Sequence, residues 1–205
     1  MRKPSGESTP ISTHASADES PQTFIHVWDL PLRLFHWSLA GCIVVAWLSA
    51  NVYETLHRVA GYSTIALVAF RMVWGMIGPR YARFGGVPKL LRAAPLYFWK
   101  LGHGRAGAYI GLNPAGALML VAALALVLIS AISGWMQITL RFFGVDWVQD
   151  IHTWSSYSVL VLSAFHVLGV VLASILQRQN LPAAMIIGRK RRRKLHISTH
   201  NISQD

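Results

Sequence analysis

The chain has 205 residues, of which 53% are hydrophobic and only 13% are charged. A soluble domain usually carries about 25% charged residues, so this composition and the mean hydropathy of +0.40 indicate an integral membrane protein. The single cysteine, Cys42, excludes a disulfide framework, a cysteine-rich zinc or iron–sulfur site, and the two-cysteine motif that attaches c-type haem. The net charge of +11 is concentrated in loops and tails.

The first segment of the chain, residues 1–23, is rich in Ser, Thr, Pro and Ala. Such a composition buries too little apolar surface to fold, so we expect a disordered tail. The segment lacks the apolar stretch of a signal peptide. The first apolar span is therefore expected to remain in the protein as an uncleaved signal-anchor.

Four later segments are long and apolar enough to cross a bilayer, whose core of about 30 Å needs about 20 helical residues. They are residues 32–50, 56–77, 114–136 and 152–176. The third span contains no charged residue. The predicted fold is therefore all-α, an integral membrane four-helix bundle within residues 24–188.

Basic residues predict the orientation of these spans, because Lys and Arg collect in cytoplasmic loops. The loop between spans two and three and the tail 189–205 are strongly basic, with Arg80, Arg83, Lys89, Arg92, Lys100 and Arg105 in the loop. The two other loops contain few basic residues. Both termini and the middle loop are therefore expected in the cytoplasm. We interpret the basic tail as a topology signal and lipid-headgroup anchor rather than a nucleic-acid site.

The middle loop also contains a stretch, residues 88–99, that mixes basic residues with aromatic and leucine side chains. This mixture favours a short element lying at the membrane interface. A binding role for it stays open.

Four of the nine histidines lie in or at the ends of the predicted spans. The expected orientation places His36 and His166 towards the cytoplasm, and His57 and His152 towards the outside. The other histidines are interpreted as solvated or interfacial residues, with a ligand role left open for two of them; these five are His14, His26, His103, His196 and His200.

The two histidines of the fourth span, His152 and His166, are fourteen residues apart. This separation is about 21 Å along a helix, and the two side chains drift only about 40° apart in two heptads. Each level therefore offers two imidazoles. Zinc usually takes three or four protein ligands, and neither level has an obvious third.

Haem iron takes only two axial ligands from the protein, so the spacing favours two bis-histidine b-type haems. Small residues on the spans leave room for the flat macrocycle, namely Gly41, Gly61, Gly134 and Gly169. Arg71 and Arg58 are expected to contact the haem propionates at the inner and outer levels. For Arg33 and Arg58, snorkelling to the interface is the alternative.

Four segments together resemble the prokaryotic cytochrome b561 family, and more closely its branch related to the cytochrome b subunit of nickel–iron hydrogenases. They are residues 27–37 (VWDLPLRLFHW), 56–62 (LHRVAGY), 70–84 (FRMVWGMIGPRYARF) and 180–190 (NLPAAMIIGRK). The resemblance implies a membrane cytochrome of the bacterial inner membrane with two haems b. Its ligands correspond to the same four residues, His36, His57, His152 and His166.

Members of the family pass electrons between membrane quinone and a redox partner, often a periplasmic c-type cytochrome or a hydrogenase. One departure concerns the segment Gly111-Leu112-Asn113-Pro114, where relatives often have a histidine in the second position. No role of that histidine is carried over to this chain, and the position of a cytoplasmic quinone site stays open.

Three other functions remain as alternatives to an electron-transfer cytochrome. Some small members of the family oxidise superoxide and pass the electron to quinone. A proton or solute transporter could use the membrane histidines as a relay, although the predicted spans contain no Asp or Glu. A purely structural anchor would need no matched histidines. The partner, the direction of electron flow and the oligomeric state are left open.

Overall fold

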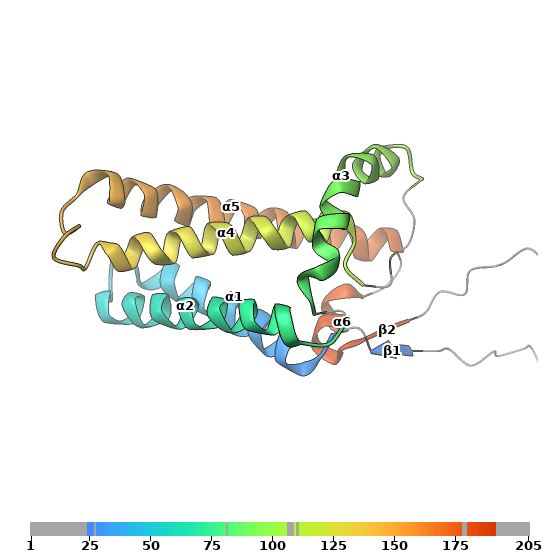
Figure 1. Ribbon diagram of the computed structural model, residues 1–205, viewed down its shortest axis with the longest axis horizontal. Coiled ribbons are helices and arrows are strands. Elements are labelled where there is room, and N and C mark those ends of the chain that lie inside the picture. The colour runs from blue at the N-terminus through green and yellow to red at the C-terminus, as the bar shows by residue number, and fades with distance from the viewer. Residues whose placement is uncertain are drawn as a thin grey trace, which may run out of the picture.

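Four long helices form the body of the protein. They are α1 (Leu30–Ser49), α2 (Glu54–Ile77), α4 (Pro114–Met136) and α5 (Asp146–Gln177), and they run along a common axis (Figure 1). This computed structural model describes residues 24–26, 28–80, 82–105, 109, 111–177 and 180–191. The predicted tail 1–23 and residues 192–205 of the basic tail lie outside these ranges. All four helices are long and apolar enough to span a membrane, which confirms the predicted four-helix architecture.

The helix ends follow from local sequence signals. Helix α4 begins at Pro114, a favoured first residue, and the side-chain oxygen of Asn113 caps it by accepting the Gly116 N–H at 2.6 Å. Helix α5 begins at Asp146, six residues before the predicted span. An acidic residue in the first turn stabilises a helix, because its negative charge interacts favourably with the helix dipole. The first turn of α5 is polar. Hydropathy therefore predicted a start at residue 152, later than the observed start at Asp146.

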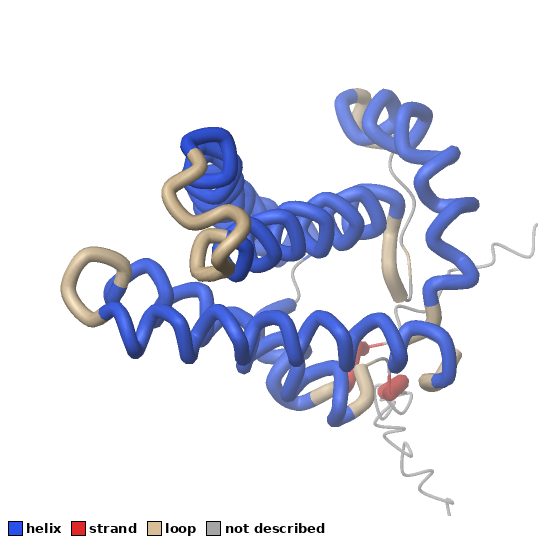
Figure 2. Tube along the Cα trace, turned by 60° about the vertical axis from the view of Figure 1, so that its left-hand side comes forward, coloured by secondary structure: helices blue, strands red, loops and turns tan. Residues whose placement is uncertain are grey.

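The helices pack in the order α1, α2, α4 and α5, and two layers are visible when the bundle is turned (Figure 2). Val68 of α2, Val127 of α4 and Val159 of α5 form a buried cluster at mid-height, with side chains of α1 beside it. Within the described ranges, α5 packs closely only against α4 and the short helix α6 (Leu181–Ile187). Helix α5 therefore faces α1 and α2 without the close backbone contact that joins the other neighbours.

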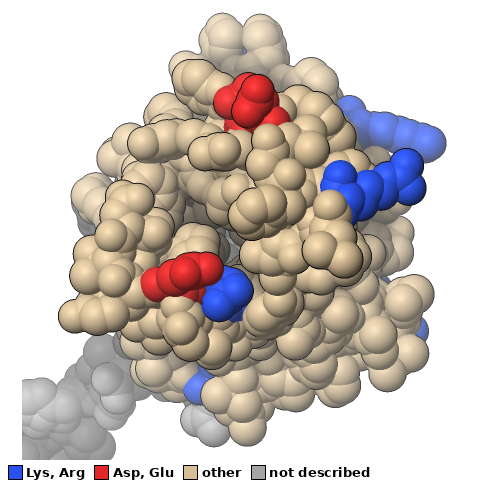
Figure 3. Space-filling model, turned by 90° about the vertical axis from the view of Figure 1, so that its left-hand side faces the viewer, with Lys and Arg blue, Asp and Glu red and all other residues tan. Residues whose placement is uncertain are grey.

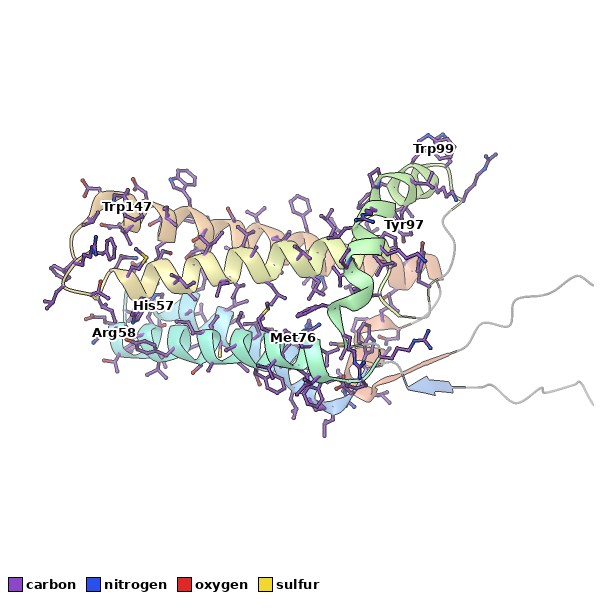
Figure 4. The ribbon with its side chains drawn as sticks, in the orientation of Figure 1. His57, Arg58, Met76, Tyr97, Trp99 and Trp147 are labelled. Atoms are coloured by element: carbon purple, nitrogen blue, oxygen red, sulfur yellow. The ribbon has the colours of Figure 1, made fainter. Side chains whose placement is uncertain are left out.

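Helix α3 (Val87–Gly102) lies across one end of the bundle and packs against α4, following the short 3-10 helix η1 (Phe84–Gly86) (Figure 1). The expectation of a short element over residues 88–99 is confirmed as a helix. Trp99 points away from the bundle (Figure 4) and Leu96 is also exposed. The Asn113 side chain joins α3 to α4 by donating to the Tyr97 hydroxyl at 3.2 Å.

The two described ends of the chain meet at this same end of the bundle. Strand β1 (Phe24–His26) pairs antiparallel with β2 (Arg189–Arg191). The Arg33 side chain donates to the carbonyls of Ile186 and Ile187 at the end of α6, so its guanidinium is used within the protein. Gly188 has a positive φ of 82°. A Cβ there would also lie 2.8 Å from the Trp28 carbonyl oxygen, so the position requires glycine.

Candidate functional site

The four histidines of the spans form two facing pairs. The ring centroids of His36 on α1 and His166 on α5 are 6.1 Å apart, and those of His57 on α2 and His152 on α5 are also 6.1 Å apart. Two imidazoles bound to one metal ion from opposite sides have ring centres about 6 Å apart, because each metal–nitrogen distance is about 2 Å. The separation within each pair would therefore allow its two histidines to hold one metal ion.

The outer pair is held by backbone carbonyls. The Nδ1–H of His57 donates to the Ala46 carbonyl of α1 at 2.8 Å, and the Nδ1–H of His152 donates to the Ser130 carbonyl of α4 at 2.8 Å. A carbonyl can only accept, so the proton of each ring is on Nδ1. A neutral imidazole with its proton on Nδ1 keeps a lone pair on Nε2, which is the form a metal ligand needs.

The inner pair lies in a different environment. Within the described part of the chain neither His36 nor His166 makes a hydrogen bond; the His36 ring has an edge contact with Trp37, at 5.4 Å between centroids. Arg71 of α2 lies at the same level. Residues on both sides of it along α2, Leu67 and Trp74, pack with the part of α1 that carries His36.

Arg71 is only 4% exposed although it carries a full charge. Its Nη2 donates to the Ala82 carbonyl at 3.1 Å, and its guanidinium carbon lies 4.2 Å from the centre of the Phe84 ring. Its Nε and Nη1 have no hydrogen-bond partner within the described residues. The two unused donors of this buried charge could bind a further anionic group. A haem propionate fits this donor set.

Gly75 makes this arrangement possible. A Cβ at Gly75 would lie 2.0 Å from the Phe84 ring, so only glycine lets that ring lie against α2. Position 75 is one helical turn beyond Arg71, and both face the same side. The segment containing Phe84 therefore closes over the guanidinium. Trp74 also fixes this region by donating from Nε1 to the Asp29 carboxylate at 2.7 Å.

The two other predicted arginines have partners. Arg58 forms an ion pair with Glu54 at 3.6 Å, and its side chain is 46% exposed. Its contact with an outer propionate stays a prediction. Arg33 donates to the end of α6, as described above.

His103 and His26 belong to neither pair. His103 follows α3, donates from Nδ1 to the Trp99 carbonyl at 2.8 Å and is exposed. His26 belongs to β1, which pairs with β2 at the end of the chain. Among the described residues, no three or more His, Cys, Asp or Glu side chains gather as a metal site. Each histidine pair therefore offers two protein ligands.

Three of the four predicted small residues border open space. A Cβ at Gly41, Gly61 or Gly169 would meet no atom within 4 Å. Gly61 is one turn beyond His57, and Gly169 is three residues beyond His166, so both share a face with a paired histidine. Gly134 differs, because the His152 ring itself occupies the space beside it. The expectation that Gly134 leaves room for the macrocycle is therefore wrong in this structure, because the His152 ring lies in that space.

The family model for prokaryotic cytochrome b561 matches residues 27–188, a range that contains all four paired histidines. The chain belongs to the prokaryotic cytochrome b561 family. Cytochromes b561 are membrane proteins that carry b-type haem and transfer electrons, so the four apolar helices and the family agree.

Two relatives of this cytochrome b561 are described as "Probable Ni/Fe-hydrogenase B-type cytochrome subunit". The protein of Azotobacter chroococcum mcd 1 is 28% identical, and that of Azotobacter vinelandii is 26% identical. Each alignment covers 82% of this chain and 88% of the relative. No solved structure matches the chain.

Sequence reasoning missed the groups that contact the paired histidines of this cytochrome b561. The acceptors of the outer pair are backbone carbonyls, which leave no signal in a sequence. Gly75 lies inside the motif that carries the resemblance, but only the contact with Phe84 explains it. The same holds for Gly134 and the His152 ring.

Proposed function

We propose that this cytochrome b561 binds two haems b and conducts electrons across the bacterial inner membrane. His36 and His166 would be the axial ligands of an inner haem, and His57 and His152 those of an outer haem. The observation that supports this is the equal 6.1 Å separation of the two facing pairs. On α5 the histidines of the two pairs are about 21 Å apart. Two haems would therefore divide electron transfer across the bilayer core of about 30 Å into shorter distances.

Haem iron supplies the chemistry by accepting and releasing one electron at a time. The protein supplies the ligands, the apolar helices that exclude water and the charges that set the potential. Arg71 would bind a propionate of the inner haem through its two unused donors. At the outer level Arg58 would do so if it turned from Glu54, its present partner.

The orientation follows from charge. The end of the bundle with α3, β1 and β2 carries exposed basic residues, including Lys89, Arg92 and Lys100. At the opposite end (Figure 3), the exposed acidic residues Glu54, Asp146 and Asp150 offset the exposed basic residues Arg58 and Arg141. The excess of Lys and Arg supports a cytoplasmic location for α3 and both termini. The pair His57 and His152 then faces the periplasm.

The partners of this cytochrome would differ at its two faces. We infer that membrane quinone exchanges electrons with the inner haem, and that a periplasmic redox protein exchanges them with the outer haem. A c-type cytochrome or a hydrogenase fits this outer role. The hydrogenase is favoured by the names of the two Azotobacter relatives. Lipid surrounds the four spans.

The experiment places the purified protein in sealed vesicles with ferricyanide trapped inside and ascorbate outside. Electron transfer through the protein bleaches the ferricyanide, and empty vesicles report the leak. His57→Ala and His166→Ala should each abolish the transfer, since each removes one level. His103→Ala is the matched control, because it changes an exposed histidine outside both pairs, and it should transfer at the normal rate. Transfer that survives loss of either pair would contradict the proposal.

A pulse of superoxide distinguishes the alternative function. A superoxide oxidase requires fast haem reduction by superoxide and delivery of the electron to quinone with no other protein present. An electron-transfer subunit needs its protein partner for rapid turnover.

A further inference from the structure

The two histidine pairs differ in the use of their second ring nitrogen. Both outer rings donate Nδ1–H to a helix carbonyl at 2.8 Å. Within the described residues the inner rings, His36 and His166, make no such bond. A histidine ligand becomes a stronger electron donor when its other N–H is given to a carbonyl, because the ring gains imidazolate character.

The outer bonds repeat the same construction in the two halves of the bundle. His57 lies in the first turn of α2 and donates back to α1, the helix before it. His152 lies near the start of α5 and donates back to α4, again the helix before it. Each accepting carbonyl is followed three residues later by a serine with its own hydrogen bond to the helix backbone, Ser49 and Ser133.

These two serines are nearly inaccessible, with 2% and 4% exposure. Their hydroxyls also lie near the carbonyls that the histidines use, at 3.4 Å from Ala46 O and 3.1 Å from Ser130 O. Serine hydroxyls that bond back to the helix are known to bend it slightly. In both helices, a buried serine hydroxyl therefore bonds to the backbone beside the carbonyl that accepts from the histidine.

Gly134 determines how closely the His152 ring approaches α4. A Cβ at this position would lie 2.8 Å from Cε1 of His152 and 3.0 Å from its Nδ1. Gly134 is one helical turn beyond Ser130, whose carbonyl accepts from that same ring. A methyl group there would push the ring away from its acceptor.

We propose that Gly134 is a positioning residue for the outer haem, seating His152 so that its Nδ1–H is donated to the Ser130 carbonyl. Together with the bond from His57 to Ala46, this makes the outer ligands strong donors and lowers the reduction potential of the outer iron. The inference rests on the proposed function, because it needs haem at the outer pair. It adds a residue that acts through the His152 ring and so sets the electron affinity of one of the two sites.

The test is a redox titration of the purified Gly134→Ala cytochrome, followed by the α bands of the reduced haems. The His57→Ala variant, which retains only the inner haem, assigns the two signals. At the wild-type outer midpoint, the ferrous-to-ferric ratio of the outer haem should rise by about fivefold, as expected from weakening one hydrogen bond. The inner haem should not shift.

Gly102→Ala is the matched control. It is also a glycine-to-alanine change, and a Cβ at Gly102 would meet nothing within 4 Å, so neither haem should shift. An unchanged outer potential in Gly134→Ala, or an equal shift of both haems, would overturn the inference.

A second measurement decides the matter if Gly134→Ala binds only the inner haem. Bis-histidine ferrous haem is diamagnetic, so the Nδ1 protons of the four ligands can be observed by NMR in the ¹⁵N-histidine-labelled wild-type protein. The two outer protons should lie downfield of the two inner ones, because only the outer ones are donated to carbonyls. Four similar shifts would overturn the inference. Absence of haem from the outer pair of the wild type would instead refute the proposed function.

Discussion

The rings of His36 and His166, on the first and last long helices, face each other with centroids 6.1 Å apart. The same distance separates His57 and His152 at the other level. Helix α5 contributes one histidine to each pair and makes no close backbone packing with α1 or α2 in the described structure. The histidines therefore face each other between helices whose backbones are not in close contact.

Substitution of one histidine should remove one haem and leave the other. His36→Ala and His166→Ala should lose the same haem, and His57→Ala and His152→Ala the other, because each pair shares one iron. Haem content per chain should fall by half in all four variants. Potentiometric titration then shows which signal remains. If His36→Ala and His166→Ala lost different signals, the pairing would be wrong.

Arg71→Gln should lower the reduction potential of the inner haem. A buried positive charge stabilises the added electron by on the order of 1–2 kcal/mol, so the ferrous-to-ferric ratio should fall roughly tenfold at a fixed potential. Arg58→Gln serves as the comparison, since Arg58 is 46% exposed and paired with Glu54. Solvent screens such a charge even where it contacts a propionate, so the outer haem should shift much less in Arg58→Gln than the inner haem does in Arg71→Gln. Equal effects of the two variants would argue against the propionate role of Arg71.

Gly75→Ala should destabilise the protein, because the new methyl group would lie 2.0 Å from the Phe84 ring. Overpacking of this kind costs about 1–3 kcal/mol, and it would also displace the ring that covers Arg71. Thermal unfolding in detergent measures the loss. Gly102→Ala, with open space around its Cβ, should unfold at the wild-type temperature. A wild-type melting temperature for Gly75→Ala would contradict the packing described.

Burial, with a smaller contribution from the Tyr109 phenol, raises the pKa of Tyr97 on α3 above its ordinary value of 10.0. As the pH rises, the Tyr97 phenol therefore loses its proton at a lower pH in the unfolded chain than in the folded protein. The resulting stability is fully present below the unfolded pKa and is lost as the pH rises through the folded pKa. In an absorbance titration, Tyr97→Phe should remove amplitude from the most alkaline part of the curve. Removal from the early part would contradict the assignment.

The sequence predicted those features that depend on long, regular helices. Hydropathy gives the spans, and the fixed rise of a helix gives the separation of His152 and His166. Lys and Arg in the loops then assign each histidine to a level without reference to any ligand. The pairing follows because four antiparallel spans bring the two levels together.

Features that depend on how helices are rotated against each other could not be predicted. The contact of Gly134 with the His152 ring requires the relative setting of α4 and α5, which hydropathy does not define. The pairing of β1 with β2 joins segments at opposite ends of the chain through only three residues each. The early start of α5 was hidden because its first turn is polar.

The most direct test of the two-haem hypothesis is the haem content of the purified wild-type protein. The protein is produced with ample haem, reduced with dithionite and quantified as the pyridine haemochrome, beside its own optical spectrum. Two facing histidine pairs predict two haems b per chain with sharp low-spin α bands. One haem per folded chain, or a colourless folded protein, would contradict it.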